Sequence, residues 1–199
     1  MLNRTLIIRQ FWQNLSDLVN NGVALKRVLQ LILSYHDSQS YFANELKKII
    51  IDMDDNWSFS AALTKNPKLF GETEANLIRI GETSDILPMV LKCLSEYFMP
   101  IRHKKYQNIY NFYNTLRIGE ESKLPLSTSL CLAQECCQGE LKVAVKKIYE
   151  DVRNGNALAA PMAESGCFCP NEVDQIDLYE EYNLLGLILT RLSNEYRVK

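Results

Sequence analysis

The sequence predicts an all-α protein of two tandem, internally repeated six-helix bundles. Apolar residues recur at the three- and four-residue spacing of a buried helical face along the chain, and no segment alternates like a strand. The same order of helix and turn signals returns about a hundred residues later. A chain of 199 residues with 47% hydrophobic content can fill two small cores.

Three helices are expected at the start of the chain. The first has an apolar face over residues 11–19 and ends at Gly22, because glycine tolerates left-handed backbone. The second covers residues 25–35, where leucines, valine and isoleucine fall on one face. Ser38 or Ser40 can cap the third, since a serine side chain accepts a hydrogen bond from a free amide of the first turn.

Three more helices complete the first bundle. Ser58 caps a short fourth helix that stops before Pro67. A fifth covers residues 72–80, and a sixth runs from about Ser84 to Phe98. The break between the last two reads Gly-Glu-Thr-Ser, which raises the question of why it contains an acid.

The second half repeats these signals in order. Phe112 matches Phe11, residues 152–162 match 54–63, and residues 176–196 match 78–98. The offset drifts only from 101 to 98 residues, and Glu180 then falls on Glu82. Two long copies favour two similar domains over a solenoid of short repeats. We therefore expect a first domain at residues 1–101, a short basic junction at 102–107 and a second domain at 108–199.

Composition excludes several classes of function. The 22 basic and 24 acidic residues are interspersed, so nucleic-acid binding is not expected. No apolar run reaches the roughly 18 to 20 residues of a membrane span, and no signal peptide is evident, so the chain as given is expected to be cytoplasmic. The six cysteines lack zinc-ligand spacing and are expected to be reduced.

No catalytic motif is present. The sequence lacks a phosphate-binding loop, a zinc-protease helix motif and a nucleophile elbow, and its two histidines are far apart, so we expect no enzyme activity. Asp52, Asp54 and Asn56 begin like an EF-hand loop, but Trp57 stands where glycine is needed and Leu63 where the bidentate glutamate belongs. A polar helix end is the better interpretation.

Glu82 has two interpretations. Its carboxylate can accept hydrogen bonds from the free amides of the helix that follows, where the helix dipole also favours it. Alternatively Glu82, alone or with Asp85 or Glu72, helps to hold a divalent cation such as calcium at an interface, because hard ions prefer carboxylate oxygens. Apart from this calcium alternative, no cofactor is expected.

The ordered motifs resemble the type II secretion system F-protein family, which includes GspF of secretion systems and PilC of type IV pili. The positions that match its three motifs are Gly22 to Leu25, Ser58 to Leu63 and Gly81 to Leu87. Asp85 replaces the second glycine of the last motif. The second copy keeps the acid as Glu180 but loses both glycines. The motif residues carried over are thus Gly22, Gly81, Glu82 and Glu180.

The resemblance implies a non-catalytic scaffold: the cytoplasmic part of an inner-membrane platform protein that binds the assembly ATPase and couples it to pilin or pseudopilin assembly. Other inner-membrane assembly components are expected partners, self-association is left open, and the sequence does not indicate the partner-binding surface. Such proteins carry membrane spans after each domain, which this chain lacks, so membrane association is expected only if the native protein has them. The alternative is a freestanding soluble helical adaptor unrelated to secretion.

Overall fold

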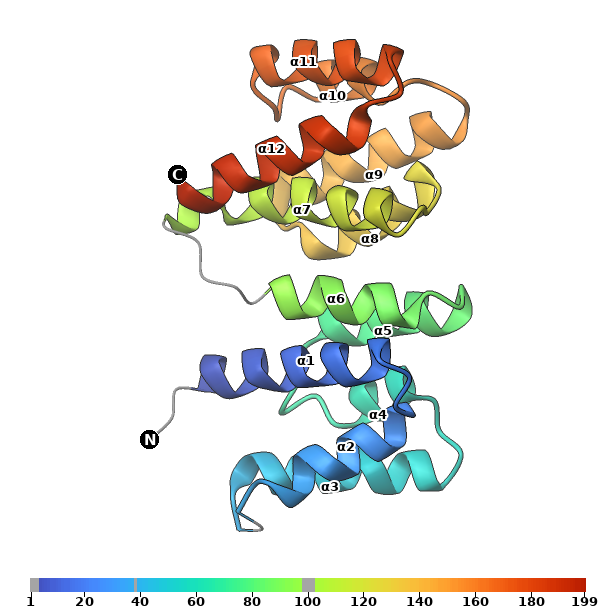
Figure 1. Ribbon diagram of the computed structural model, residues 1–199, viewed down its shortest axis with the longest axis vertical. Coiled ribbons are helices and arrows are strands. Elements are labelled where there is room, and N and C mark those ends of the chain that lie inside the picture. The colour runs from blue at the N-terminus through green and yellow to red at the C-terminus, as the bar shows by residue number, and fades with distance from the viewer. Residues whose placement is uncertain (1–3, 38, 98–102) are drawn as a thin grey trace. The chain divides into compact units, whose positions relative to one another are not determined.

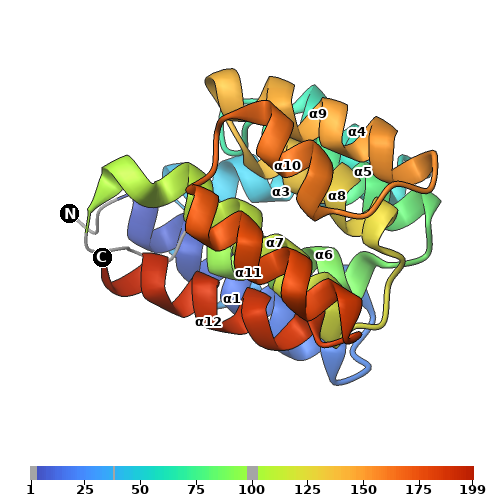
Figure 2. The same cartoon turned by 90° about the horizontal axis from the view of Figure 1, so that it is seen from above.

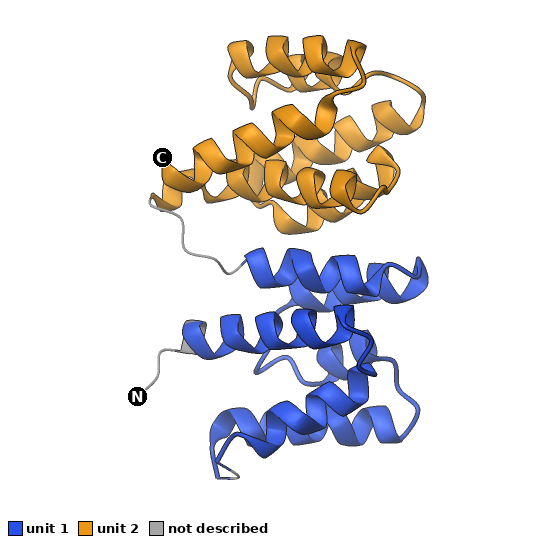
Figure 3. Ribbon diagram, in the orientation of Figure 1, with its two compact units in different colours: residues 1–99 blue, residues 100–199 orange. Residues whose placement is uncertain are grey.

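A computed structural model describes residues 4–37, 39–97 and 103–199, and these ranges contain twelve α-helices and no strand (Figure 1). The chain divides into two compact units, residues 1–99 and 100–199 (Figure 3). The predicted all-α fold of two tandem six-helix bundles is confirmed. In the part of the chain that the structure describes, no helix has both the length and the apolarity that a membrane crossing requires.

The first unit is a closed ring of six helices. They are α1 (Arg4–Asn20), α2 (Leu25–Ser34), α3 (Tyr41–Asp54), α4 (Phe59–Lys65), α5 (Glu72–Thr83) and α6 (Leu87–Tyr97). Each helix packs against the next in the chain, and α6 returns to pack against α1. The core centres on three buried aromatic rings, with the Phe70 centroid 4.9 Å from that of Phe11 and 5.0 Å from that of Trp12.

The second unit repeats this ring. Its elements are a short 3₁₀ helix η1 (Lys104–Tyr106), then α7 (Gln107–Glu121), α8 (Leu126–Cys136), α9 (Gly139–Arg153), α10 (Ala159–Ser165), α11 (Pro170–Glu181) and α12 (Leu185–Val198). The first and last helices, α7 and α12, lie side by side in both views (Figures 1 and 2). Phe112 and Phe168 take the places of Phe11 and Phe70, with centroids 4.8 Å apart. The repeat inferred from sequence is therefore a structural one.

The second core contains a buried carboxylate that two tyrosines contact. Glu172 accepts hydrogen bonds from the hydroxyls of Tyr113 (3.0 Å) and Tyr196 (2.6 Å). Burial, together with the neighbouring carboxylate, raises the pKa of both tyrosines. Trp12 occupies the position of Tyr113 in the first unit, and its indole nitrogen has no hydrogen-bond partner among the described residues. This polar pairing joins α7, α11 and α12 of the second unit.

Three turns per unit end in the same left-handed conformation. The first unit has φ of 85° at Gly22, 67° at Asn56 and 57° at Asp85; the second has 58° at Lys123, 96° at Gly155 and 56° at Asn183. At each turn the following amide bonds back to a carbonyl of the last helical turn, as from Ile86 to Gly81 (2.9 Å) and from Leu184 to Tyr179 (2.8 Å). The copies therefore keep the turn while exchanging glycine for other residues, as where Lys123 takes the place of Gly22.

Two predicted boundaries were wrong. Helix α5 does not stop at Ile80 but continues through Glu82 to Thr83, and Ser84 caps its end instead of starting the sixth helix. The left-handed Asp85 then reverses the chain, and α6 begins only at Leu87. The acid thus lies inside the last turn of a helix and not in a break between two helices.

The junction also differs from the prediction. Residues 104–106 form η1, which runs directly into α7, and the Tyr106 ring lies 5.6 Å from that of Tyr196. This aromatic contact makes the described part of the junction a portion of the second unit. Ser38, Phe98 and Arg102, which the sequence assigned to a cap, a helix end and the junction, lie outside the described residues.

Candidate functional site

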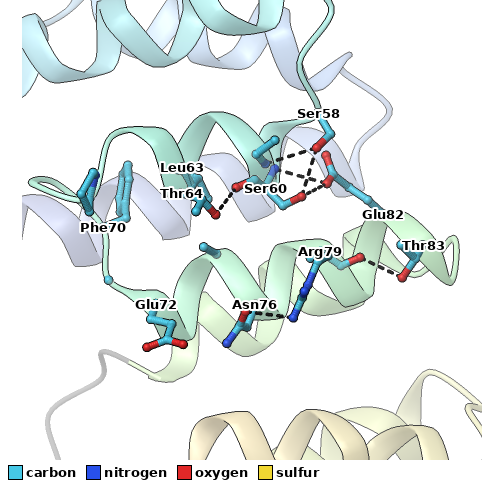
Figure 4. Close-up of a pocket in the computed structure, with 14 residues that line it drawn as sticks. Ser58, Ser60, Leu63, Thr64, Phe70, Glu72, Asn76, Arg79, Glu82 and Thr83 are labelled. Carbon is cyan, nitrogen blue, oxygen red and sulfur yellow. Dashed lines mark hydrogen bonds between the residues drawn. The ribbon is translucent and has the colours of Figure 1, made fainter.

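The carboxylate of Glu82 caps the start of α4. It accepts hydrogen bonds from the amides of Phe59 (2.7 Å) and Ser60 (3.2 Å) and from the hydroxyl of Ser60 (2.5 Å) (Figure 4). Ser58 caps the same helix as predicted, since its hydroxyl accepts from the amide of Ala61 (3.2 Å). The first three amides of α4, which have no partner within the helix, are therefore all satisfied.

Glu180 does the same in the second unit. Its oxygens lie 2.8 and 2.9 Å from the amide nitrogen of Leu158, and one lies 3.3 Å from that of Ala159. Ala159 stands where the first unit has Ser60, so no hydroxyl is available to this acid. What the two copies share is a carboxylate on backbone amides at a helix start, where the dipole favours negative charge.

Capping was predicted correctly, but the capped helix was not. We expected Glu82 to cap the helix that follows it, whereas it caps α4, which begins 23 residues earlier in the chain. The cause is the position of Glu82 at the C-terminal end of α5, which packs against α4. The contact is thus a tertiary one that fixes α5 to α4.

A groove of about 630 Å³ lies beside this contact (Figure 4). Its lining comes from α4, α5 and the loop between them, and it includes the apolar side chains of Leu63, Pro67 and Phe70. Arg79 is the basic residue of the lining, and its guanidinium donates to the side-chain oxygen of Asn76 (3.0 Å). The groove therefore offers an apolar surface bordered by one cation, Arg79, and by the exposed carboxylate of Glu72. The sequence prediction missed Arg79, because only the packing of α5 on α4 assigns it to a groove.

Gly81 sets the spacing between α5 and α6. A Cβ atom at this position would lie 3.1 Å from Leu87 Cα and 3.1 Å from a methyl carbon of Val90. Such contacts are closer than packed side chains normally allow, so glycine permits the two helices to approach. Gly22 has a different role, since it supplies the left-handed turn after α1.

The polar groups around Glu82 are engaged in capping α4. Ser60 is only 6% exposed, and its hydroxyl donates to the carboxylate of Glu82. The groove lining contains no histidine, cysteine or lysine that could act as a base or nucleophile.

The described residues contain no group of three or more His, Cys, Asp or Glu side chains able to hold a metal ion. Asp85 is exposed at a left-handed turn, and Glu72 is exposed in the first turn of α5. Calcium binding by Glu82 and Asp85 stays a prediction, which calorimetry on the wild type and the Glu82→Ala variant can test.

Asp52, the first residue of the EF-hand-like segment, serves to join α3 to the end of α4. Its carboxylate accepts from the Lys65 ammonium (2.5 Å) and from the Asn66 side-chain amide (2.7 Å). These hydrogen bonds lower the pKa of Asp52. The polar helix end expected from the sequence is therefore an ion-paired connection within the first unit.

Comparisons with known proteins match this architecture. The model of the family described as "Type II secretion system (T2SS), protein F" matches residues 11–111 and again residues 112–199. A relative, the type IV pilus assembly protein PilC of Thermus thermophilus, is 32% identical over 87 residues. That alignment covers 44% of this chain and 21% of the relative, so the aligned part of the chain spans about a fifth of the relative's length.

Proposed function

The chain belongs to the protein F family of type II secretion systems, and from this premise we propose that it is the cytoplasmic part of an inner-membrane platform protein. In this role it is a non-catalytic scaffold that binds the assembly ATPase and couples it to pilin or pseudopilin assembly. Nucleotide hydrolysis then belongs to the partner, in keeping with a sequence that has no phosphate-binding loop.

The observation that carries the proposal is the pair of family matches, at residues 11–111 and 112–199, each of which corresponds to a ring of six helices. Each unit has its own core, its own ring of six helices and its own carboxylate cap on a short helix. A fixed carboxylate cap and buried helix contacts favour a rigid body that passes on a force, which is what coupling an ATPase to filament assembly requires. Two such bodies in tandem also provide two different surfaces for partners.

On the first unit, we assign the groove between α4 and α5 as the surface that binds the ATPase. Its apolar lining and the Arg79 guanidinium suit an apolar side chain next to an acidic one on the partner. Arg79 is exposed, so changing it does not disturb the core. The charge at this position is therefore accessible to a partner and to mutagenesis.

Binding of the purified cognate assembly ATPase to the chain, followed by light scattering and pull-down, tests the proposal. We expect a complex that the Arg79→Glu variant weakens at least about tenfold, since reversing the charge at the edge of the groove replaces attraction with repulsion. Arg27→Glu is the matched control, because Arg27 is also exposed but lies on α2. Absence of a complex with the wild type contradicts the scaffold proposal, whereas equal weakening by both variants contradicts only the groove.

A further inference from the structure

The exposed face of α11 differs in charge from its counterpart in the first unit. Asp174, Asp177 and Glu181 are spaced by three and four residues, so they lie on one face of α11, and all three are exposed. With the offset of 98, the matching positions of α5 are Asn76, Arg79 and Thr83. The second unit therefore presents three acids where the first presents a single cation.

Apolar side chains share this face. Leu178 and Tyr182 lie beside the acids and are 52% and 65% exposed, and Leu184 and Leu187 follow across the turn at 46% and 62%. Met89, the counterpart of Leu187, is buried at 7%. The exposure is thus a property of the second unit. We call the following residues the α11–α12 patch: Asp174, Asp177, Leu178, Glu181, Tyr182, Leu184 and Leu187.

The negative charge of the patch is not neutralised within its own helix. Helix α11 contains no lysine or arginine. On α12, the Arg191 guanidinium lies over the Tyr179 ring (5.7 Å) and is 3.7 Å from Glu195, so its charge already has partners. On α7, Glu120 is exposed and lies against Gly186, directly beside Leu187. Acids therefore border the apolar side chains on two helices.

We propose that the α11–α12 patch docks a cationic amphipathic helix of a partner protein. The leucines and Tyr182 would bury against the apolar face of such a helix, as amphipathic helices bind hydrophobic surfaces. Its lysines or arginines would pair with Asp177, Glu181 and their neighbours, and this charge complementarity sets orientation and association rate. The same acids repel an anionic membrane surface or a nucleic acid. The interaction does not depend on the function proposed above.

Fluorescence anisotropy of a labelled 18-residue lysine–leucine amphipathic peptide, titrated with the full chain, tests the assignment. We expect saturable binding that weakens as salt rises, and at least about tenfold weaker binding by either of two double variants. One variant, Asp177→Lys with Glu181→Lys, reverses charge. The other, Leu178→Ser with Leu187→Ser, removes apolar contact. All four side chains are exposed, so both variants should keep the wild-type helical circular dichroism.

The control is Val143→Ser with Glu150→Lys, which makes the same kinds of change on the exposed face of α9 in the same unit. The control should bind the peptide like the wild type. No binding, equal loss in the control, or equal affinity for a peptide with glutamate in place of lysine would overturn the assignment. Dimerisation of the wild type in light scattering, abolished by Leu178→Ser with Leu187→Ser, would instead identify the patch as a self-association surface and also overturn it.

Discussion

Replacing Glu82 by alanine should destabilise the first unit through the start of α4. The substitution removes the acceptor of three hydrogen bonds, two from the amides of Phe59 and Ser60 and one from the Ser60 hydroxyl. Phe59 and Ser60 are buried, so water cannot fully replace the carboxylate. Because α5 is joined to α4 by this contact, the loss should affect the whole unit and not only one helix end.

The magnitude follows from the contacts. Loss of a helix N-cap typically costs about 0.5 to 2 kcal/mol, and a hydrogen bond to a charged group contributes about 1.5 to 3 kcal/mol. Since Glu82 itself is only half-buried, water can form some of the lost hydrogen bonds in the variant, which reduces the loss of stability. We expect a loss of about 2 to 3 kcal/mol in the free energy of unfolding, which for a unit of this size lowers the melting temperature by roughly 10 to 20 °C.

The position of the two tryptophans gives an assay specific to the first unit. Trp12 and Trp57 are both in that unit, and the chain contains no other tryptophan. Tryptophan fluorescence during thermal or urea unfolding therefore reports the first unit, while far-ultraviolet circular dichroism reports both. Glu82→Ala should move the fluorescence transition to lower temperature or urea concentration. Glu180→Ala should leave the fluorescence transition unchanged and should lower only the part of the circular dichroism transition that comes from the second unit.

Glu72→Ala is the control within α5, because Glu72 is exposed and lies in the first turn, away from the capped helix start. Glu72→Ala should lower the free energy of unfolding by less than about 1 kcal/mol, which is the usual size of a helix-dipole contribution. If Glu82→Ala shifts the fluorescence transition no further than Glu72→Ala, the carboxylate does not stabilise α4 and our account of this acid is wrong.

Three further outcomes are expected. Lys123→Gly should stabilise the second unit by about 1 kcal/mol in the dichroism transition, because φ of 58° is unfavourable for a residue with a side chain. Gly81→Ala should lower the stability of the first unit by about 1 to 3 kcal/mol in the fluorescence transition, since its Cβ would crowd Val90. Asp52→Asn should lower the urea midpoint at pH 7. This difference should vanish on acidification, because a group with a lowered pKa stabilises the fold above its unfolded pKa of 3.8 and loses that effect as the pH falls through the folded value.

Local patterns were sufficient for the fold. Apolar spacing gave the helices. Ser40 was one of two candidate caps for the third helix and Ser58 was the predicted cap of the fourth, and both accept hydrogen bonds from the third amide of their helix. The repeat then predicted that Glu180 and Glu82 share a role, which the structure supports with the same kind of contact. These features depend on residues a few positions apart or on direct similarity between the halves.

The parts that the sequence did not predict depend on contacts between distant segments. A glycine followed by polar residues was interpreted as a helix break, but Gly81 is helical because α6 packs closely against it. The helix capped by Glu82 could not be identified without the packing of α5 on α4. Similarly, the charge difference between Arg79 and Asp177 was visible in the sequence, but only burial shows that both face solvent.

Comparison of the two copies distinguishes the contacts that the fold requires from the surface positions that can change. The left-handed turn at the end of α5 and α11 accepts Asp85 or Asn183, because a backbone hydrogen bond closes it and the side chain contributes little. The carboxylate at Glu82 and Glu180 has no such substitute, since only a long acceptor can reach the amides of a neighbouring helix. The helical frame is thus held by a few shared contacts, while exposed positions such as Arg79 differ freely between the units. Two copies of one bundle can then present different surfaces, as the α11–α12 patch does with acids at positions where the first copy has Asn76, Arg79 and Thr83.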